Sequence, residues 1–299
     1  MKHENSTFLC GAAETVELFF FAKELDSLVE KETENSSFFV RFQDQWYKYS
    51  YSSGWPAISM AVIKPLNQDR TVVAVAQTGE YWEVKTKSLQ ETHGEIGGVV
   101  ESIRALTSLD DIIFACGMGR TVLRRESPGT WVEIGPGMSP DDSQNVAGFE
   151  DIGGFSSQDM YAVGWLGEIW QYTNLQWQQL VSPVSANLNA VCCADDGLVY
   201  VVGDDGIMLR GRDSLWEIIE TGRTDNLMDV AAYDGTVYVS TDFEILKLID
   251  DSLVAEDAFL EPDDAPETCL HLLEAKDGLV SIGTKDVTVL VGGSWMRLV

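Results

Sequence analysis

Few side chains in this sequence have the type and spacing that catalysis requires. The three histidines form neither the His-Glu-x-x-His nor the His-x-His spacing that brings two imidazoles to one metal ion. They are His3, His93 and His271. No Gly-x-Ser-x-Gly elbow presents a nucleophile, and neither a Walker loop nor a dinucleotide fingerprint is present to cradle a phosphate. We therefore expect no catalytic residues and no cofactor.

Two Asp-Asp-Gly runs could in principle hold calcium, because carboxylate oxygens are the ligands that this ion prefers. They are Asp195-Asp196-Gly197 and Asp204-Asp205-Gly206. The EF-hand spacing is absent around both, and Asp-Gly is an ordinary choice for a hairpin turn. We interpret both runs as structural turns and predict no metal site.

The cysteines are odd in number and have no regular spacing, and no pair shows the two-residue gap of a metal-binding motif. They are Cys10, Cys116, Cys192, Cys193 and Cys269. Reduced and mostly buried thiols are the expectation, which is typical of a cytosolic protein.

The elements that position these residues follow a repeat of about forty residues. Each unit has an apolar strand ending in Gly, a short turn, a second strand, another turn and a Trp that opens a third strand. The interval from Gly to Trp is nearly constant, from Gly117 to Trp131, Gly164 to Trp177, Gly203 to Trp216 and Gly283 to Trp295. Weaker copies have Ala76 and Thr241 in the Gly position, and an opening strand completes four strands per unit. This period and strand number predict an all-β fold, a β-propeller.

We predict about seven four-stranded blades in a single propeller domain over residues 1–299, with residues 1–50 as a diverged first blade. Six blades are possible if the N-terminal segment is an accessory element. The Trp that recurs once per blade is expected to pack between blades, at Trp46, Trp131, Trp177, Trp216 and Trp295.

The units resemble those of bacterial propellers with WD40-like, sialidase-like and photosystem-assembly-factor-like repeats. The run Val199-Tyr-Val-Val-Gly-Asp-Asp-Gly-Ile-Met-Leu-Arg210 carries the resemblance best, and the likeness extends over about residues 55–299. It implies the fold rather than a function. The sialidase Ser-x-Asp-x-Gly-x-x-Trp box is not present as such, which argues against sialidase chemistry.

One face of such a propeller carries the turn between the second and third strands of each blade and the connection to the next blade. We expect this face to gather the candidate partner-binding residues, which are Met118, Asp141, Asp142, Trp165, Leu166, Asp204, Asp205, Asp242, Phe243, Asp263 and Asp264. Trp165, Leu166 and Phe243 occupy turn tips where Asp, Asn and Gly are usual, as interface anchors would. In the alternative interpretation, Trp165 folds back over its own blade.

The net charge of −28, from 48 acidic and 20 basic residues, excludes some partners and favours others. Direct binding of nucleic acid or of an anionic membrane is disfavoured, because no basic patch offsets the phosphate charge. An acidic, well-solvated surface explains the charge without a function. A surface that attracts a basic protein explains it equally well.

The acidic composition resembles that of the propeller immunity proteins encoded beside type VI secretion toxins. That resemblance implies a protein-binding inhibitor, monomeric before complex formation, that blocks a basic, cytoplasm-acting toxin such as a nuclease by occupying its active-site groove. No secretory signal is evident, so we expect a cytoplasmic location without a membrane anchor. Two alternatives remain, an assembly or scaffold propeller, and a carbohydrate-binding or carbohydrate-active propeller that uses its axial pocket.

Overall fold

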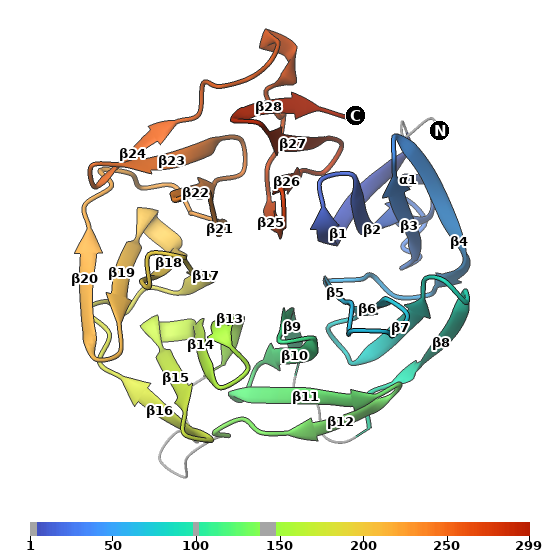
Figure 1. Cartoon of the computed structure of the whole chain (residues 1–299), viewed down its shortest axis with the longest axis horizontal. Helices are drawn as coiled ribbons and strands as arrows, with labels where there is room; N and C mark the ends of the chain where they lie inside the picture. The colour runs from blue at the N-terminus through green and yellow to red at the C-terminus, as the bar shows by residue number, and fades with distance from the viewer. Residues whose placement is uncertain (1–4, 98–101, 138–147) are drawn as a thin grey trace.

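The computed structural model describes residues 5–97, 102–137 and 148–299 of the chain (Figure 1). Seven antiparallel sheets of four strands each are arranged radially around a central axis (Figure 1). The predicted all-β propeller is confirmed, and the ring has seven blades rather than six.

Each sheet consists of four consecutive strands, and the first strand of each lies nearest the axis (Figure 1). The first three blades contain β1 (Ser6–Thr15), β2 (Leu18–Leu25), β3 (Ser36–Phe42) and β4 (Gln45–Ser53); β5 (Ser59–Ile63), β6 (Thr71–Val75), β7 (Glu80–Lys85) and β8 (Gln90–Glu95); and β9 (Ile103–Leu109), β10 (Ile112–Gly117), β11 (Thr121–Ser127) and β12 (Thr130–Glu133).

Blades 4 to 7 follow the same plan. They contain β13 (Phe149–Ser156), β14 (Asp159–Gly164), β15 (Ile169–Thr173) and β16 (Gln176–Leu180); β17 (Leu188–Cys193), β18 (Val199–Gly203), β19 (Met208–Arg212) and β20 (Leu215–Ile219); β21 (Asp229–Tyr233), β22 (Thr236–Ser240), β23 (Ile245–Ile249) and β24 (Ser252–Ala255); and β25 (His271–Ala275), β26 (Gly278–Ile282), β27 (Val287–Val291) and β28 (Ser294–Arg297).

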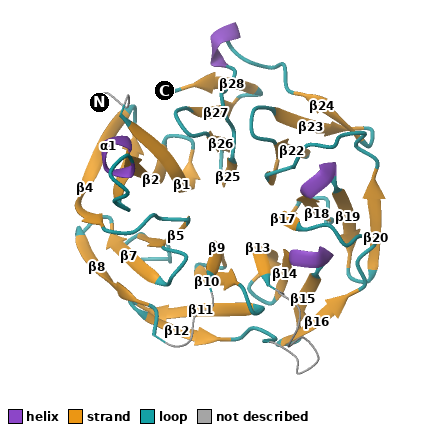
Figure 2. Cartoon of the chain, turned by 180° about the vertical axis from the view of Figure 1, so that it is seen from behind, coloured by secondary structure: helices purple, strands orange, loops and turns teal. Residues whose placement is uncertain are grey.

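Short helical segments occur only in connections within the described residues, and Figure 2 shows them in purple. They are α1 (Asp26–Val29) after β2, η2 (Trp165–Gly167) after β14, η3 (Asp204–Gly206) after β18 and η4 (Pro262–Asp264) between β24 and β25.

The hydrophobic core lies between the blades, because each blade packs both of its faces against its neighbours. The second strands are therefore almost continuously apolar, and every residue of β6, β18 and β26 is buried. Aromatic contacts join adjacent blades. Phe38 of blade 1 stacks on Trp82 of blade 2 with ring centroids 4.2 Å apart. Trp216 and Trp295 lie edge-on to Tyr161 and Tyr238 of the preceding blades, which is the packing role predicted for the recurrent Trp.

The glycine that ends a second strand is required by a close approach of the chain. At Gly164 a Cβ would lie 1.9 Å from the carbonyl oxygen of Gly148, and at Gly203 it would lie 2.2 Å from that of Asn187. The connection entering the blade thus runs directly against the end of its second strand. This contact explains why Gly recurs at one position of the repeat.

The ring closes between blade 7 and blade 1 without a shared strand, since β1–β4 and β25–β28 form separate sheets. The Phe8 amide donates to the Thr284 carbonyl at 2.9 Å, and the Lys276 amide donates to the Glu14 carbonyl at 3.0 Å. Lys285 forms an ion pair with Asp26 at 2.7 Å across the same junction. Buried Phe and Val side chains of the two blades pack beneath these contacts.

All five cysteines are free thiols, and four of them are buried. Over residues 5–97, 102–137 and 148–299, no helix is long and apolar enough to cross a membrane. Within those same residues, no group of three or more His, Cys, Asp or Glu side chains is placed to hold a metal ion.

Candidate partner-binding face and axial cavity

The two ends of the propeller carry different kinds of loop. The connector face carries the connections between blades and the turns between second and third strands. The hairpin face carries the remaining turns, those between first and second and between third and fourth strands. The candidate residues that the structure describes all belong to elements of the connector face.

Four of these candidates lie at exposed turn tips of consecutive blades. We call them the connector patch: Leu166 of blade 4, Asp205 of blade 5, and Asp242 and Phe243 of blade 6. Phe243 is 68% exposed and Leu166 is 54% exposed, so both present large apolar side chains to solvent. Val181, in the connection between blades 4 and 5, is 87% exposed and was not singled out from the sequence.

Trp165 folds back over its own blade, as the alternative interpretation held. Its indole N–H donates to the carboxylate of Glu150 on β13. Glu150 also forms an ion pair with Arg104 of β9 at 3.6 Å. Trp165 is therefore half-buried against the inner strand of its blade rather than free at the tip.

Asp204 and Asp264 are half-buried and accept hydrogen bonds from neighbouring groups of the fold. Asp204 accepts hydrogen bonds from the side-chain amides of Asn187 and Asn189, both at 3.1 Å. Asp264 accepts the backbone N–H groups of Glu261 and Arg297, each at 3.0 Å.

The remaining candidates do not join the patch. Asp263 is exposed, but η4 lies against β28 at the rim of blade 7, away from the axis (Figure 1). Met118 is half-buried against Gly148. Asp141 and Asp142 lie outside the described residues.

The positive charge of the chain is largely neutralised within the fold. Every arginine forms an ion pair with an Asp or Glu side chain, including the bidentate pair of Arg120 with Glu168 and that of Arg125 with Glu83. The net negative charge therefore comes from the carboxylates left over from these pairs. Such a surface attracts cationic partners and repels anionic ones.

The hairpin face is also acidic and also has exposed leucines, which the sequence argument did not consider. Leu175 and Leu215 are 69% and 79% exposed in its turns. Asp213, Asp250 and Asp251 lie in the same set of turns. Charge alone therefore does not distinguish the two faces.

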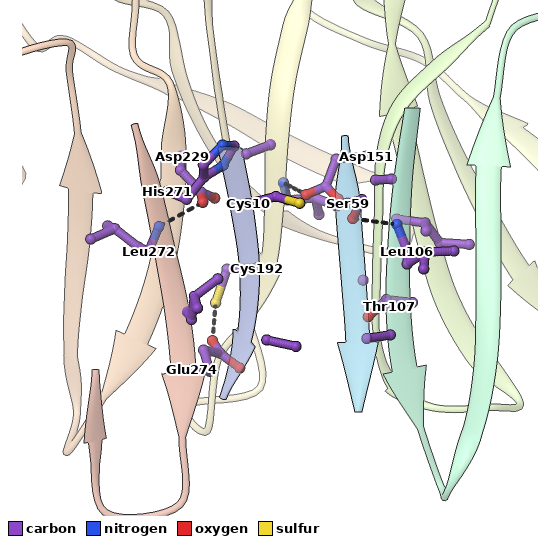
Figure 3. Close-up of a pocket in the computed structure, with 18 of the residues that line it drawn as sticks. Cys10, Ser59, Leu106, Thr107, Asp151, Cys192, Asp229, His271, Leu272 and Glu274 are labelled. Atoms are coloured by element: carbon purple, nitrogen blue, oxygen red, sulfur yellow. Dashed lines mark hydrogen bonds between the residues drawn. The ribbon is translucent and has the colours of Figure 1, made fainter. Parts of the chain in front are cut away.

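The axis of the propeller holds a cavity of about 570 Å³ that the first strands of all seven blades line (Figure 3). Polar side chains project into it in two tiers. Asp151, Asp229 and His271 form one tier, and Cys192 and Glu274 belong to the other (Figure 3). The first tier lies toward the connector face, because it comes from the beginnings of the first strands.

The cavity carboxylates bridge neighbouring blades. The inner edge of each first strand has no further strand to pair with, so its N–H groups need other acceptors. Asp151 accepts the Val191 N–H at 2.8 Å, and Asp229 accepts the Leu272 N–H at 2.8 Å. Glu274 accepts the Ala232 N–H at 3.1 Å and the Cys192 thiol at 3.2 Å.

This environment changes the protonation of the cavity groups. Burial away from water, reinforced by the charge of Asp151, raises the pKa of Asp229 to about 8. Burial likewise raises the pKa of Asp151 to about 6, and it raises the pKa of Glu274. Burial lowers the pKa of His271, so this imidazole is neutral at pH 7. The same cause, desolvation, disfavours the charged form in every case.

Seven radial four-stranded blades define the chain as a WD40-like β-propeller. Solved propellers that it resembles include YCF48 bound to D1 peptide, with a TM-score of 0.68, 13% identity and coverage of 98% of this chain and 92% of that one. The WD40 domain of Doa1 gives a TM-score of 0.67 with 10% identity and coverage of 99% and 93%. At such low identities the likeness shows the fold alone.

A scan against models of protein families finds no match. The chain is, however, 38% identical over 252 residues to the immune protein Tsi7 of Pseudomonas aeruginosa, covering 82% of this chain and 80% of that protein. The chain belongs to the family of the immune protein Tsi7.

Proposed function

We propose that this chain is an immunity protein that binds a cognate toxin and neutralises it without catalysis. The observation that carries the proposal is its membership of the family of the immune protein Tsi7. The net charge of −28 supports a basic partner, because a surface with excess carboxylates attracts cationic proteins.

In the finer form of the proposal, the toxin is a basic protein such as a nuclease that acts in the cytoplasm. The propeller meets it there as a monomer and occupies its active-site groove. A groove that binds a polyanion presents positive charge, and a carboxylate-rich surface competes for that charge.

The connector patch is our candidate for the contact surface, because the exposed apolar side chains of Leu166 and Phe243 lie there with exposed carboxylates of neighbouring blades. Leu166 has a φ of 58°, in the left-handed region that Gly, Asn and Asp tolerate and that disfavours a bulky side chain. An exposed leucine in this conformation gains little from burial in the free protein. Burial against a partner would give the side chain a reason to be there.

Co-expression with a cognate toxin tests the proposal. We expect the chain to restore growth, and the purified complex to weaken at least tenfold between 50 and 500 mM NaCl because charge steers it. Growth arrest despite full expression of both proteins would refute the immunity role. Tight binding that salt leaves unchanged would refute the electrostatic part alone.

The chain offers a matched control for the contact surface. Leu175, with a φ of 62°, is an exposed leucine in the same backbone conformation on the hairpin face. Leu166→Asp should weaken toxin binding by about 1–2 kcal/mol, and Leu175→Asp should leave it unchanged. The opposite result would move the interface to the hairpin face.

No specific observation favours the scaffold or the carbohydrate alternative. The likeness to YCF48 concerns the fold, and the axial carboxylates already accept hydrogen bonds from the backbone.

A further inference from the structure

The axial cavity lies directly behind the connector face. Asp229 is the first residue of β21 and Asp151 is the third residue of β13, so both carboxylates stand near the ends of strands that begin at that face. Figure 3 shows them in one tier on opposite sides of the view, with Cys10 between them. A side chain that entered from the connector face would meet this tier first.

The charge inside the cavity is unbalanced. Four carboxylates line it, those of Glu150, Asp151, Asp229 and Glu274, and Arg104 is the single lysine or arginine among the described lining residues. Arg104 is already paired with Glu150. No lysine or arginine of the described chain forms an ion pair with the other three carboxylates, although every arginine elsewhere has such a partner.

Backbone groups fix the positions of these carboxylates without neutralising them. Asp229 accepts the N–H groups of Val230 and Leu272, both at 2.8 Å, and Asp151 accepts that of Val191. Neutral donors orient a carboxylate but add no positive charge, and a buried charge without a counter-ion is costly. The cavity therefore holds two oriented acidic groups that have no ion-pair partner among the described residues. Without a cation from outside the fold, burial favours the protonated form of these groups.

We propose that the axial cavity is a receptor for one alkylammonium or alkylguanidinium group, which the toxin supplies as a lysine or arginine side chain that pairs with Asp151 and Asp229. The part of this proposal that names a toxin as the source of the cation rests on the proposed function. A cavity of about 570 Å³ has room for such a side chain. The two carboxylates come from blades 4 and 6, which suits an extended organic cation, and no cluster for a metal ion is found within the described residues.

Proton release follows from this pairing. Asp229 is mostly protonated at pH 7, since burial raises its pKa to about 8. A cation beside it favours the ionised form, so binding expels a proton to the solvent, and affinity rises as the pH rises through this range. The charged and titratable groups that line the cavity with Asp229 are Glu150, Asp151, Glu274, Cys10, Cys192, Cys193, His271 and Arg104. The charges of Asp151 and Glu274 add to burial in raising the pKa of Asp229.

The cation receptor is tested without any toxin, with agmatine as the probe and amide NMR of the intact protein as the readout. We expect saturable shifts of the Leu272 and Val191 amides, which contact the two carboxylates, and an apparent affinity at least fivefold higher at pH 9 than at pH 6. Absence of saturable shifts at both amides at pH 9 would overturn the receptor. So would an affinity that does not change between the two pH values.

Two variants test whether Asp229 causes the pH dependence of agmatine binding. Asp229→Asn should sharply reduce the pH dependence, whereas Asp250→Asn, which removes an exposed carboxylate of the hairpin face, should preserve it. Because Asn keeps only one acceptor for two N–H groups, the unfolding curve of Asp229→Asn is recorded in parallel. The pH dependence of the wild-type protein decides the matter even if this variant does not fold.

A second arm tests whether the toxin is the source of the cation. Calorimetry of complex formation at pH 7, in two buffers of different ionisation enthalpy, should show net proton release for the wild type and none for Asp229→Asn. The affinity of Asp229→Asn for the toxin should be at least tenfold lower than that of the wild type. A toxin that binds without proton release would overturn that source while leaving the immunity function intact. A toxin that does not bind at all would overturn the proposed function, and the agmatine result would still stand by itself.

Discussion

The turn after β14 in blade 4 and the turn after β18 in blade 5 share one backbone but carry opposite chemistry. Leu166 has φ and ψ of 58° and 25°, and Asp205 has 56° and 29°. The Leu166 N–H donates to the side chain of Asn187 at 3.2 Å, and the Asp205 N–H donates to that of Asn226 at the same distance. Blade 4 nevertheless places Trp-Leu-Gly where blade 5 places Asp-Asp-Gly.

This comparison separates what the fold requires from what it only permits. The backbone of this turn requires glycine at its third position, where φ is 74° in Gly167 and 72° in Gly206. It favours Asp or Asn at the second position, as blade 5 has, since their short polar side chains tolerate this conformation. The backbone of the turn therefore does not account for a leucine at its second position in blade 4.

The largest expected effect tests whether the two turns are equivalent. Gly164→Ala and Gly203→Ala would each drive a Cβ into a backbone carbonyl oxygen, at 1.9 and 2.2 Å. We expect each to lower the free energy of unfolding by about 3 kcal/mol, because backbone must move to relieve the overlap. Urea unfolding followed by tryptophan fluorescence measures both. A loss in only one variant would show that the turns differ in packing as well as in sequence.

The next effect concerns binding. Converting the tip of blade 4 into that of blade 5 with the double change Trp165→Asp and Leu166→Asp should weaken toxin binding by about 2 kcal/mol or more if this tip is an interface anchor. Isothermal titration measures the affinity, and circular dichroism checks that the fold persists. Unchanged affinity in a folded variant would contradict the assignment of the blade 4 tip as an interface anchor.

A smaller effect, a gain in the free energy of unfolding, should appear in the free protein when Leu166 is removed. Leu166→Gly should raise the free energy of unfolding by up to about 1 kcal/mol, since glycine relieves the left-handed strain of an exposed leucine. Asp205→Leu, the reverse exchange in blade 5, should lower it by about the same amount. Thermal and urea unfolding give both values. A leucine that stabilises either tip would remove the strain argument.

The smallest effect concerns the asparagine side chains that accept the N–H groups of Leu166 and Asp205. Asn187→Ala should lower the free energy of unfolding by about 1 kcal/mol, because Asn187 is half-buried and holds Asp204 as well as Leu166. Asn226→Ala should cost about half as much, since water can replace the exposed amide at Asp205. Equal losses in urea unfolding would mean that the bond to Asp204 contributes nothing.

The fold was predictable because its signals are local and repeated. Gly117, Gly164, Gly203 and Gly283 mark one position of the blade, and the structure shows the reason at Gly164 and Gly203, where the incoming connection touches the strand. Repetition turned a weak signal at each turn into a prediction of about seven four-stranded blades, and the structure has seven.

The candidate site was predictable only in part, because exposure and pairing depend on the assembled ring. The sequence places Asp204 beside Asp205, but only the fold shows that Asn187 and Asn189 bind the first and leave the second exposed. Asp263 and Asp264 lie in a connection between blades on the same face as the patch, yet η4 lies against β28 at the rim.

The cavity acids were missed for a related reason. The sequence predicts an opening strand in each unit, and Asp229 begins that strand in blade 6, but the sequence argument for the site did not include this carboxylate. A polar residue in that strand was the available signal. The Asp229 carboxylate accepts the N–H of Leu272 in the next blade, and these two residues are 43 positions apart in the sequence.

The closure of the ring has a mechanical consequence. Six junctions between blades are also spanned by the polypeptide itself, whereas the junction between blade 7 and blade 1 depends on non-covalent contacts such as those of Glu14, Lys276 and Lys285. Under force or heat we expect the ring to open first at the junction between blade 7 and blade 1. A hydrogen-exchange map would then show early exchange at the amides of Phe8 and Lys276, ahead of their counterparts around the rest of the circle.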